Sequence, residues 1–486
     1  MSRFHAVAVL FILAQAAFAQ DKLVLDDYLG QVKAKGPAYR AAQASVEGYE
    51  KQSHQQDLLY SPQLGLSYGH QSNYQLQPNN PFYPTSTLGD SFIASLSDKL
   101  PFGPSISLGY AVTNVNLEFP SSALAFLGSL PNYYPEYFQA APVASLSMPL
   151  VKDFLGTQTH AGAKKVQYQL ESASQGAVFQ REQVLFNAKV AYWRLALARE
   201  TLAIRQNTLE RSQKIWEWTK RRVARNLADP PDALQAEASV RVAELDLETA
   251  QEDERSARLE FNRYRNVPED QVPEKLGSLE DSLAGMKVEV PEDPAARMDL
   301  RATESTALQQ KAVFDEAYQN ILPDITLLAS YQGNGLGSQW GPANDMAFGT
   351  DHPVWTLGAQ FNLSLDVFTA QRTADGYELN YKSAQLALED KKAEVGQQWQ
   401  DLRHHLTDVD KRLEMAAQIE SIQKDKADQE KTRLELGRTT QFQLLSFEND
   451  YSLARLNRLS LVLEKLSYLA QAQWWLTTEP DASGKD

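Results

Sequence analysis

Two long stretches of the chain repeat apolar residues with the spacing of a coiled coil. Both stretches lack proline and are rich in residues that favour helices; they lie between Pro149 and Pro230 and between Pro353 and Pro480. In the first, residues at a seven-residue spacing predict a coiled-coil seam. Its members are Ala188, Leu195, Leu202, Leu209, Trp216 and Val223. Helices over about 157–225 and 370–436 would each be on the order of 100 Å long.

Three other segments alternate apolar residues with small or polar ones, as β-strands do. They are 62–70, 105–113 and 356–365. In the second segment, for example, Leu108 and Tyr110 alternate with Ser107 and Gly109. This pattern suits a sheet with one apolar and one polar face. Transmembrane barrel strands have it, and so do half-buried strands of ordinary antiparallel sheets.

The first residues have the pattern of a secretory signal peptide. Arg3 supplies a positive charge, an apolar stretch follows, and Ala17 and Ala19 form an A-x-A cleavage site. We therefore expect residues 1–19 to be removed on export. Later segments do not reach the roughly 18 uninterrupted apolar residues of a transmembrane helix, so the sequence predicts that any membrane insertion is by strands.

Composition and charge exclude several classes of function. The chain has 47 Lys and Arg against 62 Asp and Glu, a formal net charge of −15, which argues against nucleic-acid binding through phosphates. With no cysteine, it has no thiolate metal site or cysteine nucleophile. Nucleophile-elbow, phosphate-loop and dinucleotide motifs are not found in a suitable context. We expect neither an enzyme nor a bound cofactor.

The sequence also repeats itself. Arg40 and Pro62 match Arg301 and Pro323 at the same offset, 261 residues. Further along, a six-residue match has an offset of 211: it pairs 232–237 with 443–448. The difference, 261 − 211 = 50, indicates an insertion in the first copy.

These offsets predict the domain organisation. A first repeat over 20–290 contains the insertion at about 70–142, a second repeat covers 291–479, and 480–486 is a short tail. Each repeat contains, in order, a helix, strands, a long helix, a turn and a helix.

Three local motifs complete the pattern. One is a strand entry, one lies at the start of the second repeat and one follows the second long helix; they are Leu322-Pro323-Asp324-Ile325, Arg297-Met298-Asp299-Leu300 and Leu436-Gly437-Arg438-Thr439. In this order, and with the duplication, the sequence resembles the TolC-like outer-membrane efflux and secretion channels over essentially the whole mature chain.

The resemblance implies an α+β membrane protein. Three protomers would form one transmembrane β-barrel, continuous with a long α-helical coiled-coil tunnel across the periplasm of a Gram-negative cell. The implied partners are two further copies of the chain, outer-membrane lipid, a periplasmic adaptor protein and, indirectly, an inner-membrane pump of the RND, ABC or MFS type.

The number of strands per protomer stays open at this point. A few strands from one chain leave open edges that lipid cannot satisfy, so closure needs several copies. Four strands each would give 3 × 4 = 12. Strand-like segments at 91–100 and 105–116 either raise this to 3 × 6 = 18 or form an extracellular hairpin. We expect four.

Two turns between helices, about 225–232 and 436–443, are the expected periplasmic entrance. By resemblance, such turns close the tunnel and meet the adaptor, which makes Arg225, Asn226, Leu227 and Gly437 candidates for docking. The alternative is that Asn226 and Gly437 simply end their helices, since both residue types adopt left-handed backbone conformations.

Five residues of these turns are candidates for the gate: Asp232, Arg438, Thr439, Gln443 and Ser446. Some relatives have acidic residues where this chain has Gln443 and Ser446, so a cation-binding ring there is doubtful and Asp232 is the better acidic candidate. Thr440 and Gln443 also have the spacing of a capping box, and Asp229 before Pro230 that of an N-cap.

The sequence thus favours a passive conduit of a tripartite efflux or type I secretion system. The rival hypothesis is a periplasmic or secreted coiled-coil scaffold without a pore.

Overall fold

The computed structural model describes residues 22–74, 83–129, 135–272, 274–292 and 297–477. The expected signal peptide and the tail 480–486 lie outside these residues. The chain forms two compact units, each built from separate stretches of sequence. Unit 1 contains the described parts of Met1–Val46, Gly176–Asp299 and Lys392–Asp486, and unit 2 contains those of Glu47–Gln175 and Leu300–Lys391.

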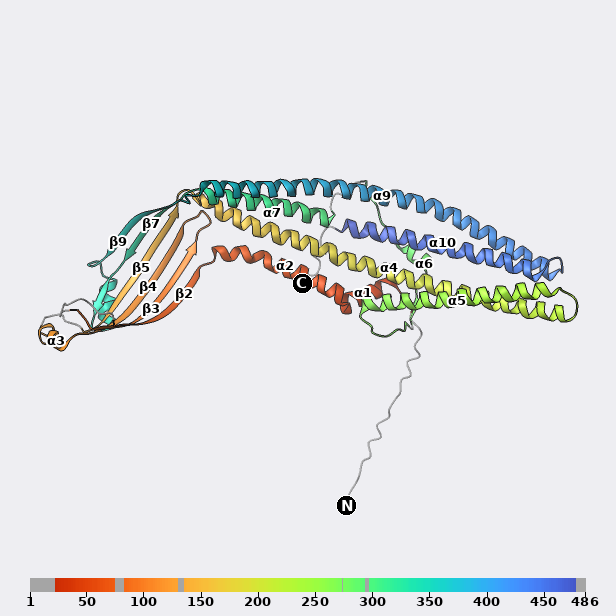
Figure 1. The fold of residues 1–486 in the computed structure, drawn as a ribbon, viewed down its shortest axis with the longest axis horizontal. Coiled ribbons are helices and arrows are strands. Elements are labelled where there is room, and N and C mark those ends of the chain that lie inside the picture. Colours follow the sequence, from red (N-terminus) through yellow and green to blue (C-terminus); the bar gives the residue numbers. More distant parts are fainter. Residues whose placement is uncertain (1–21, 75–82, 130–134, 273, 293–296, 478–486) are drawn as a thin grey trace, which may run out of the picture. The chain divides into compact units, whose positions relative to one another are not determined.

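The two predicted long helices are confirmed. Helix α4 spans Thr157–Ala224 and α9 spans Val367–Glu435, and each is followed by a 36-residue helix, α5 (Pro230–Arg265) or α10 (Gln441–Leu476) (Figure 1). None of the helices in the described part of the chain is both long and apolar enough to cross a membrane.

Shorter elements accompany these four helices. Unit 1 also holds a two-stranded parallel sheet and two short helices: β1 (Lys22–Leu23), β6 (Lys275–Leu276), α1 (Leu25–Lys35) and α6 (Leu279–Gly285). The remaining helical elements are α2 (Pro37–Gln52), η1 (Ser53–Tyr60), α3 (Ser121–Leu127), η2 (Phe154–Gly156), α7 (Met298–Ile321) and α8 (Trp340–Ala347).

The core of unit 1 is aromatic. Tyr28 of α1 stacks on Phe261 of α5 with ring centroids 4.1 Å apart, and its hydroxyl donates to the Phe261 carbonyl at 3.0 Å. Trp193 of α4 is fully buried in the same cluster. The predicted seam contributes Ala188 and Leu195, both with no exposed surface, so the seven-residue spacing identifies the buried face of α4.

A second cluster of unit 1 explains the motif at Arg297-Met298-Asp299-Leu300. The Arg297 guanidinium forms two hydrogen bonds with the Asp299 carboxylate, at 2.7 and 2.9 Å. It also lies 4.4 Å from the ring centroid of Trp475, which packs against Trp399. The motif therefore anchors the start of α7 to the aromatic side chains of α9 and α10.

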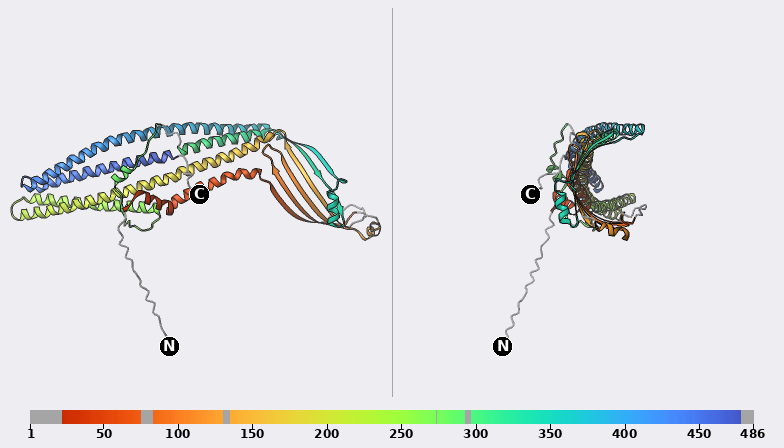
Figure 2. Two further views of the ribbon diagram at one scale, coloured as in Figure 1. Left: turned by 180° about the vertical axis from the view of Figure 1, so that it is seen from behind. Right: turned by 90° about the vertical axis from the view of Figure 1, so that its left-hand side faces the viewer.

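Unit 2 contains an antiparallel sheet whose long strands pair in the order β2-β3-β4-β5-β7-β9 (Figure 1). Their bounds are β2 Gln63–Asn73, β3 Ser86–Lys99, β4 Ser105–Glu118, β5 Glu136–Pro149, β7 Asp324–Gln332 and β9 Val354–Asn362. A short strand, β8 (Gly335–Gly337), pairs with β5. The end-on view in Figure 2 shows that the sheet curves across its strands.

The expectation of four strands is wrong, because the sheet has six long ones. The inserted segment forms the 14-residue strands β3 and β4, which pair with each other and with β2 and β5 inside the sheet. The apolar–polar alternation of 91–100 and 105–116 already had the period of the other strands. It carries no information on whether a hairpin joins the sheet or projects from it.

Register gives the sheet two different faces, as the alternation predicts. One row across the first three strands joins Leu66, Ala94 and Tyr110. The row one residue away, on the opposite face, contains Ser95 and Gly109. Because the side-chain period of a strand is two, each strand presents its apolar set to one face and its small or polar set to the other.

The aromatic core predicts a large and local effect of truncation. Phe261→Ala should lower the free energy of unfolding by about 3–5 kcal/mol, because a fully buried aromatic ring is lost and a cavity remains. Leu259→Ala, on the exposed side of the same helix, should change it by no more than about 0.5 kcal/mol. Chemical denaturation of the purified protein measures both. Equal effects of the two variants would contradict the assignment of this core.

Candidate functional site

The turn between α4 and α5 closes the first helix with a left-handed residue. Asn226 has φ = 53°, and its N–H donates to the Val223 carbonyl at 3.0 Å. The next N–H, of Leu227, reaches back to the Arg222 carbonyl at 2.9 Å. These two bonds are the Schellman pattern of a helix C-terminus. The Arg222 guanidinium adds a bond to the Leu227 carbonyl at 2.8 Å.

The turn between α9 and α10 has the same construction. Gly437 has φ = 70°; its N–H donates to the Leu434 carbonyl and that of Arg438 to the Arg433 carbonyl, both at 2.9 Å. The helix that follows begins at the N-cap Thr440, whose hydroxyl accepts from the Gln443 N–H at 3.2 Å, as the spacing predicts.

Corresponding residues of the two turns and of the helices that follow them are always separated by the same number of residues. Asn226 and Gly437 are 437 − 226 = 211 residues apart, and so are the two N-caps, Asp229 and Thr440. Helices α5 and α10 begin and end at the same separation, 441 − 230 and 476 − 265. Sequence offset and backbone geometry therefore coincide at both turns.

The predicted site residues fall into two exposed groups, at the same end of the unit 1 helices in Figure 1. Arg225, Asn226 and Leu227 lie in the first turn and Asp232 at the start of α5. Gly437 and Arg438 lie in the second turn, and Gln443 and Ser446 in the first residues of α10; all eight are exposed. Thr439 is half-buried.

Asp232 has a local structural role. It occupies the third position of α5, after Pro230, and its carboxylate accepts from the Asp229 N–H at 3.3 Å. This bond satisfies a backbone donor that the start of a helix otherwise leaves open. Asp232 remains exposed to solvent while it caps the helix.

Glu430 is a residue that the sequence analysis missed. Its side chain is 4% exposed, forms an ion pair with Arg433 at 3.0 Å and accepts a hydrogen bond from the Thr439 hydroxyl. The carboxylate thus joins the C-terminal part of α9 to the second residue after the left-handed Gly437. In the sequence Glu430 is one of many acidic residues of a long helix, and no spacing distinguishes it.

Ion pairs connect the two helical hairpins of unit 1 behind the turns. Arg211 of α4 lies 3.4 Å from Glu448 of α10, and Arg455 of α10 lies 3.9 Å from Glu200 of α4. Burial raises the pKa of Glu200 above its ordinary value; Arg455 opposes this and Glu280 adds to it. The hairpins are therefore held by partly buried charges in addition to the apolar seam.

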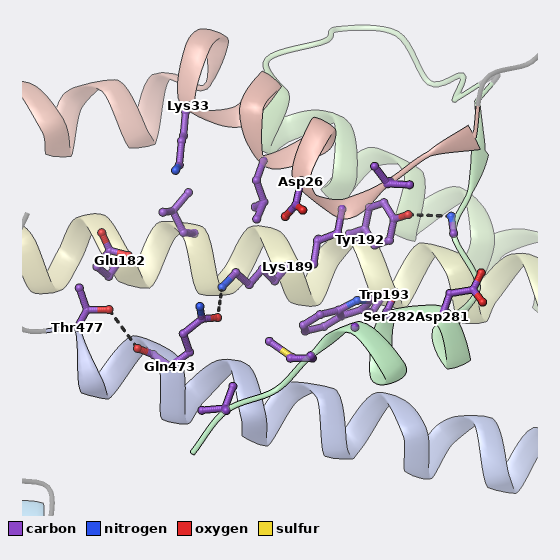
Figure 3. Close-up of a pocket in the computed structure, with 18 of the residues that line it drawn as sticks. Asp26, Lys33, Glu182, Lys189, Tyr192, Trp193, Asp281, Ser282, Gln473 and Thr477 are labelled. Carbon is purple, nitrogen blue, oxygen red and sulfur yellow. Dashed lines mark hydrogen bonds between the residues drawn. The ribbon is translucent and has the colours of Figure 1, made fainter. Parts of the chain in front are cut away.

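A cavity of about 890 Å³ lies between α1, α4, the connector around α6 and the end of α10 (Figure 3). Lys189 is a half-buried cation that lines it: its ammonium donates to Gln473 at 2.6 Å, and partial desolvation lowers its pKa. The Tyr192 hydroxyl accepts a hydrogen bond from the Gly277 N–H at 2.8 Å and donates one to the Leu23 carbonyl at 2.7 Å. These bonds tie the connector to α4, which is a structural role.

Metal binding has no support in the described part of the chain. There, no group of three or more His, Cys, Asp or Glu side chains is placed to hold a metal ion. The features that remain as a candidate functional site are the two turns and the Glu430 cluster.

The second turn should depend on its glycine. Gly437→Ala places a Cβ in a left-handed conformation that costs about 1 kcal/mol, although the surrounding space is open. Exchange of the Arg438 amide hydrogen should become about fivefold faster. Asn226→Gly is the control at the first turn and should leave exchange of the Leu227 amide within about twofold. Unchanged exchange in Gly437→Ala would contradict this role.

Comparison with known proteins gives structural similarity only. No protein-family model matches the sequence, and no curated protein sequence does either. Solved structures do match, at low sequence identity and nearly full length. They include CusC, studied for transmembrane channel formation (TM-score 0.65, 13% identity, 93% of this chain and 91% of that one).

Two outer-membrane channels match in the same way. The CmeC channel of Campylobacter jejuni has a TM-score of 0.63 at 13% identity, over 93% of this chain and 85% of that one. The open state of the Neisseria gonorrhoeae MtrE channel has a TM-score of 0.61 at 17% identity, over 93% of this chain and 88% of that one. The resemblance drawn from the sequence is thus confirmed at the level of the fold: this chain has the fold of the TolC-like outer-membrane channels.

Proposed function

We propose that the chain is the outer-membrane channel of a tripartite efflux or type I secretion system, a passive conduit from the periplasm to the exterior. The observation that carries this proposal is the sheet of six long strands, which has one apolar face, one small polar face and two exposed edge strands. A lipid-facing wall around a wet lumen needs these three properties together.

The edges support assembly from several copies. In β2 every residue but Asn73 is exposed, and in β9 every residue is. An edge strand presents unpaired N–H and C=O groups, which a hydrocarbon environment cannot satisfy. All long strands pair antiparallel along the sheet, so β9 of one copy and β2 of the next would run in opposite directions and can pair. By resemblance the ring closes with three copies, 3 × 6 = 18 strands.

The apolar stretch of β3 is slightly shorter than the apolar band of an outer-membrane barrel. Asp98 and Asp90 of β3 bracket the apolar residues Leu96, Ala94 and Phe92 on that face. The eight residue steps between the two carboxylates span about 26 Å along the strand, or about 20 Å when the strand tilts by about 40°. The apolar band of outer-membrane barrels is of similar height, about 25 Å.

Exposed apolar side chains also follow the helices of unit 1. On α5 they are Leu234, Val242 and Leu245, each at least 60% exposed, and on α9 they are Met415, Ile419 and Ile422. Their spacings of three, four and eight residues place each set on one helical face. A neighbouring copy that covers these faces would extend the ring of strands as a helical tunnel across the periplasm.

We also infer that the chain is a duplication of one unit. The shared offset of 211 residues at the turns supports this, and so does the offset of 261 between the starts of α2 and α7 and of β2 and β7. Strands β3 and β4 would then be the insertion of the first copy.

In this proposal the two turns form the entrance. Asp232, Arg438, Thr439, Gln443 and Ser446 are gate residues, and Arg225, Asn226, Leu227 and Gly437 dock a periplasmic adaptor that links the channel to an inner-membrane pump. Outer-membrane lipid surrounds the sheet.

The competing hypothesis, a periplasmic scaffold, predicts no pore. Purified protein added to a planar lipid bilayer should give discrete conductance steps, and outer-membrane fractions should contain a heat-modifiable trimer. Recovery as a freely soluble periplasmic protein without conductance would overturn the channel proposal.

A charge on the apolar face should block assembly. Leu108→Lys puts an ammonium on the apolar face at a cost of about 2–4 kcal/mol, so the trimer recovered from outer membranes should fall severalfold. Ser107→Lys, the neighbouring residue on the polar face, should retain most of the trimer. A similar loss in both variants would contradict the assignment of the faces.

The Glu430 cluster should control opening of the entrance. Thr439→Val removes a hydrogen bond to a charged group, worth about 1.5–3 kcal/mol, and should raise the open probability in planar bilayers about tenfold. Thr432→Val is the control, because the Thr432 hydroxyl bonds only within its own helix, to the Asp428 carbonyl. An unchanged open probability in Thr439→Val would remove this cluster from the gate.

Cation sensitivity should be gained by one substitution. Gln443→Asp places three carboxylates at the entrance of a trimer and should shift block by magnesium to at least tenfold lower concentrations, if the position faces the lumen. Conductance titrations with and without magnesium measure the shift. An unchanged magnesium response would place Gln443 away from the lumen.

A further inference from the structure

The apolar face of the sheet is not uniform, because it carries a groove of about 600 Å³ over β2, β3 and β4. This volume is within the range of ligand-binding pockets. Most of the floor consists of two rows of the apolar face, whose side chains are apolar or aromatic; Ser67 and Ile93, between these rows, also line the groove. The rows are Leu66–Ala94–Tyr110 and Tyr68–Phe92–Val112.

Helix α8 supplies the wall of the groove. Trp340, its first residue, lines the groove and is 52% exposed. The helix lies directly on the sheet: Ala343 and Ala347 pack on Ala140 of β5. A side chain at Gly335 would overlap the Ala343 carbonyl, so glycine permits this close approach.

A hydrogen bond and a ring contact fix the helix in place. The Tyr110 hydroxyl donates to the Asn344 side chain at 2.7 Å, and the ring of Tyr110 stacks on Phe348 with centroids 6.0 Å apart. The wall is therefore held by the same residue that forms part of the floor, so the groove is a preformed feature of the fold.

One end of the groove is polar. The next row of the sheet is His70–Asp90–Asn114, on the same face. Asp90 accepts from the Tyr68 hydroxyl at 2.8 Å and lies 2.9 Å from Nδ1 of His70. At the other end the next row is Leu64–Leu96–Leu108, which continues the apolar surface. An apolar groove with polar groups at one end is complementary to an amphiphile, which has an apolar chain and a polar headgroup.

We propose that this groove binds a hydrocarbon chain of a membrane lipid, with the polar headgroup of the lipid at His70 and Asp90. The proposal rests on the proposed function, in which this face of the sheet is in the membrane, and adds that one lipid is held at a defined site. The Asp90 carboxylate accepts hydrogen bonds from headgroup hydroxyl or amino groups. Because Nδ1–H of His70 faces Asp90, Nε2 of the neutral imidazole accepts from such groups as well, and Nε2–H of the protonated imidazole donates to headgroup oxygens.

Two tryptophans on this face allow a direct test. Trp340 lines the groove, whereas Trp355 of β9 is 72% exposed and lies outside it. Protein reconstituted with lipids brominated in the acyl chain is extracted into a mild detergent, and tryptophan fluorescence is compared among wild type, Trp340→Phe and Trp355→Phe. Quenching of the Trp340 component should persist after extraction, while that of Trp355 is relieved. Equal relief of both overturns the proposal.

A filled groove should lose the lipid. Ala94→Phe places a ring on the floor, and Ala329→Phe makes the same change on the same face at β7, outside the groove. Native mass spectrometry of the extracted protein should show retained lipid in wild type and Ala329→Phe, and at least fivefold less in Ala94→Phe. Equal retention in all three, or a retained peptide in place of lipid, overturns the proposal.

These experiments distinguish failure of the lipid site from failure of the proposed channel function. If Ala94→Phe conducts like wild type but loses the lipid, both proposals stand. If all variants conduct and none retains lipid, only the lipid site fails. If wild type neither inserts nor conducts, the channel proposal fails and the lipid site fails with it.

Discussion

The pairing register of the sheet is the constraint on which the rest of unit 2 depends. A shift of β3 by one residue against β2 would exchange Ala94 for Ser95 opposite Leu66 and would move the whole apolar set of the strand to the other face. Register is strongly determined here because the two faces differ so much along all six long strands. The apolar character of one face, the small or polar character of the opposite face and the rows that form the groove floor all follow from that one alignment.

In unit 1 the corresponding constraint is the termination of two long helices. A helix end leaves four carbonyls without intrahelical partners, and each turn satisfies two of them with the same pair of backbone bonds. Around this shared backbone the side chains differ. Arg222 closes the first turn through a carbonyl, whereas Glu430 closes the second through Arg433 and Thr439. The two turns therefore have the same backbone geometry and different side-chain chemistry.

Much of the fold could be predicted because its signals are local or periodic. The seam through Ala188 and Leu195, the ends of the long helices and the positions of β2, β4 and β9 all followed from spacing and proline placement. The strand number did not, because alternation in 91–100 and 105–116 reports the period of a strand and not its neighbours. Glu430 was missed for a related reason: its burial depends on Thr439, nine residues away and beyond a turn.

By itself, then, the sequence determined the elements and their faces: the seam of α4, the left-handed Asn226 and Gly437, the caps at Asp229 and Thr440, and the two-sided character of the strands. Each of these depends on residues within a few positions of one another, where covalent geometry limits the choices. Tertiary structure decided what lies beside what: β3 and β4 inside the sheet, Arg297 against Trp475, and α8 over β5 with a groove beside it. Such contacts join residues far apart in sequence, and only packing and hydrogen-bond satisfaction select them from the many pairings that the same local patterns permit.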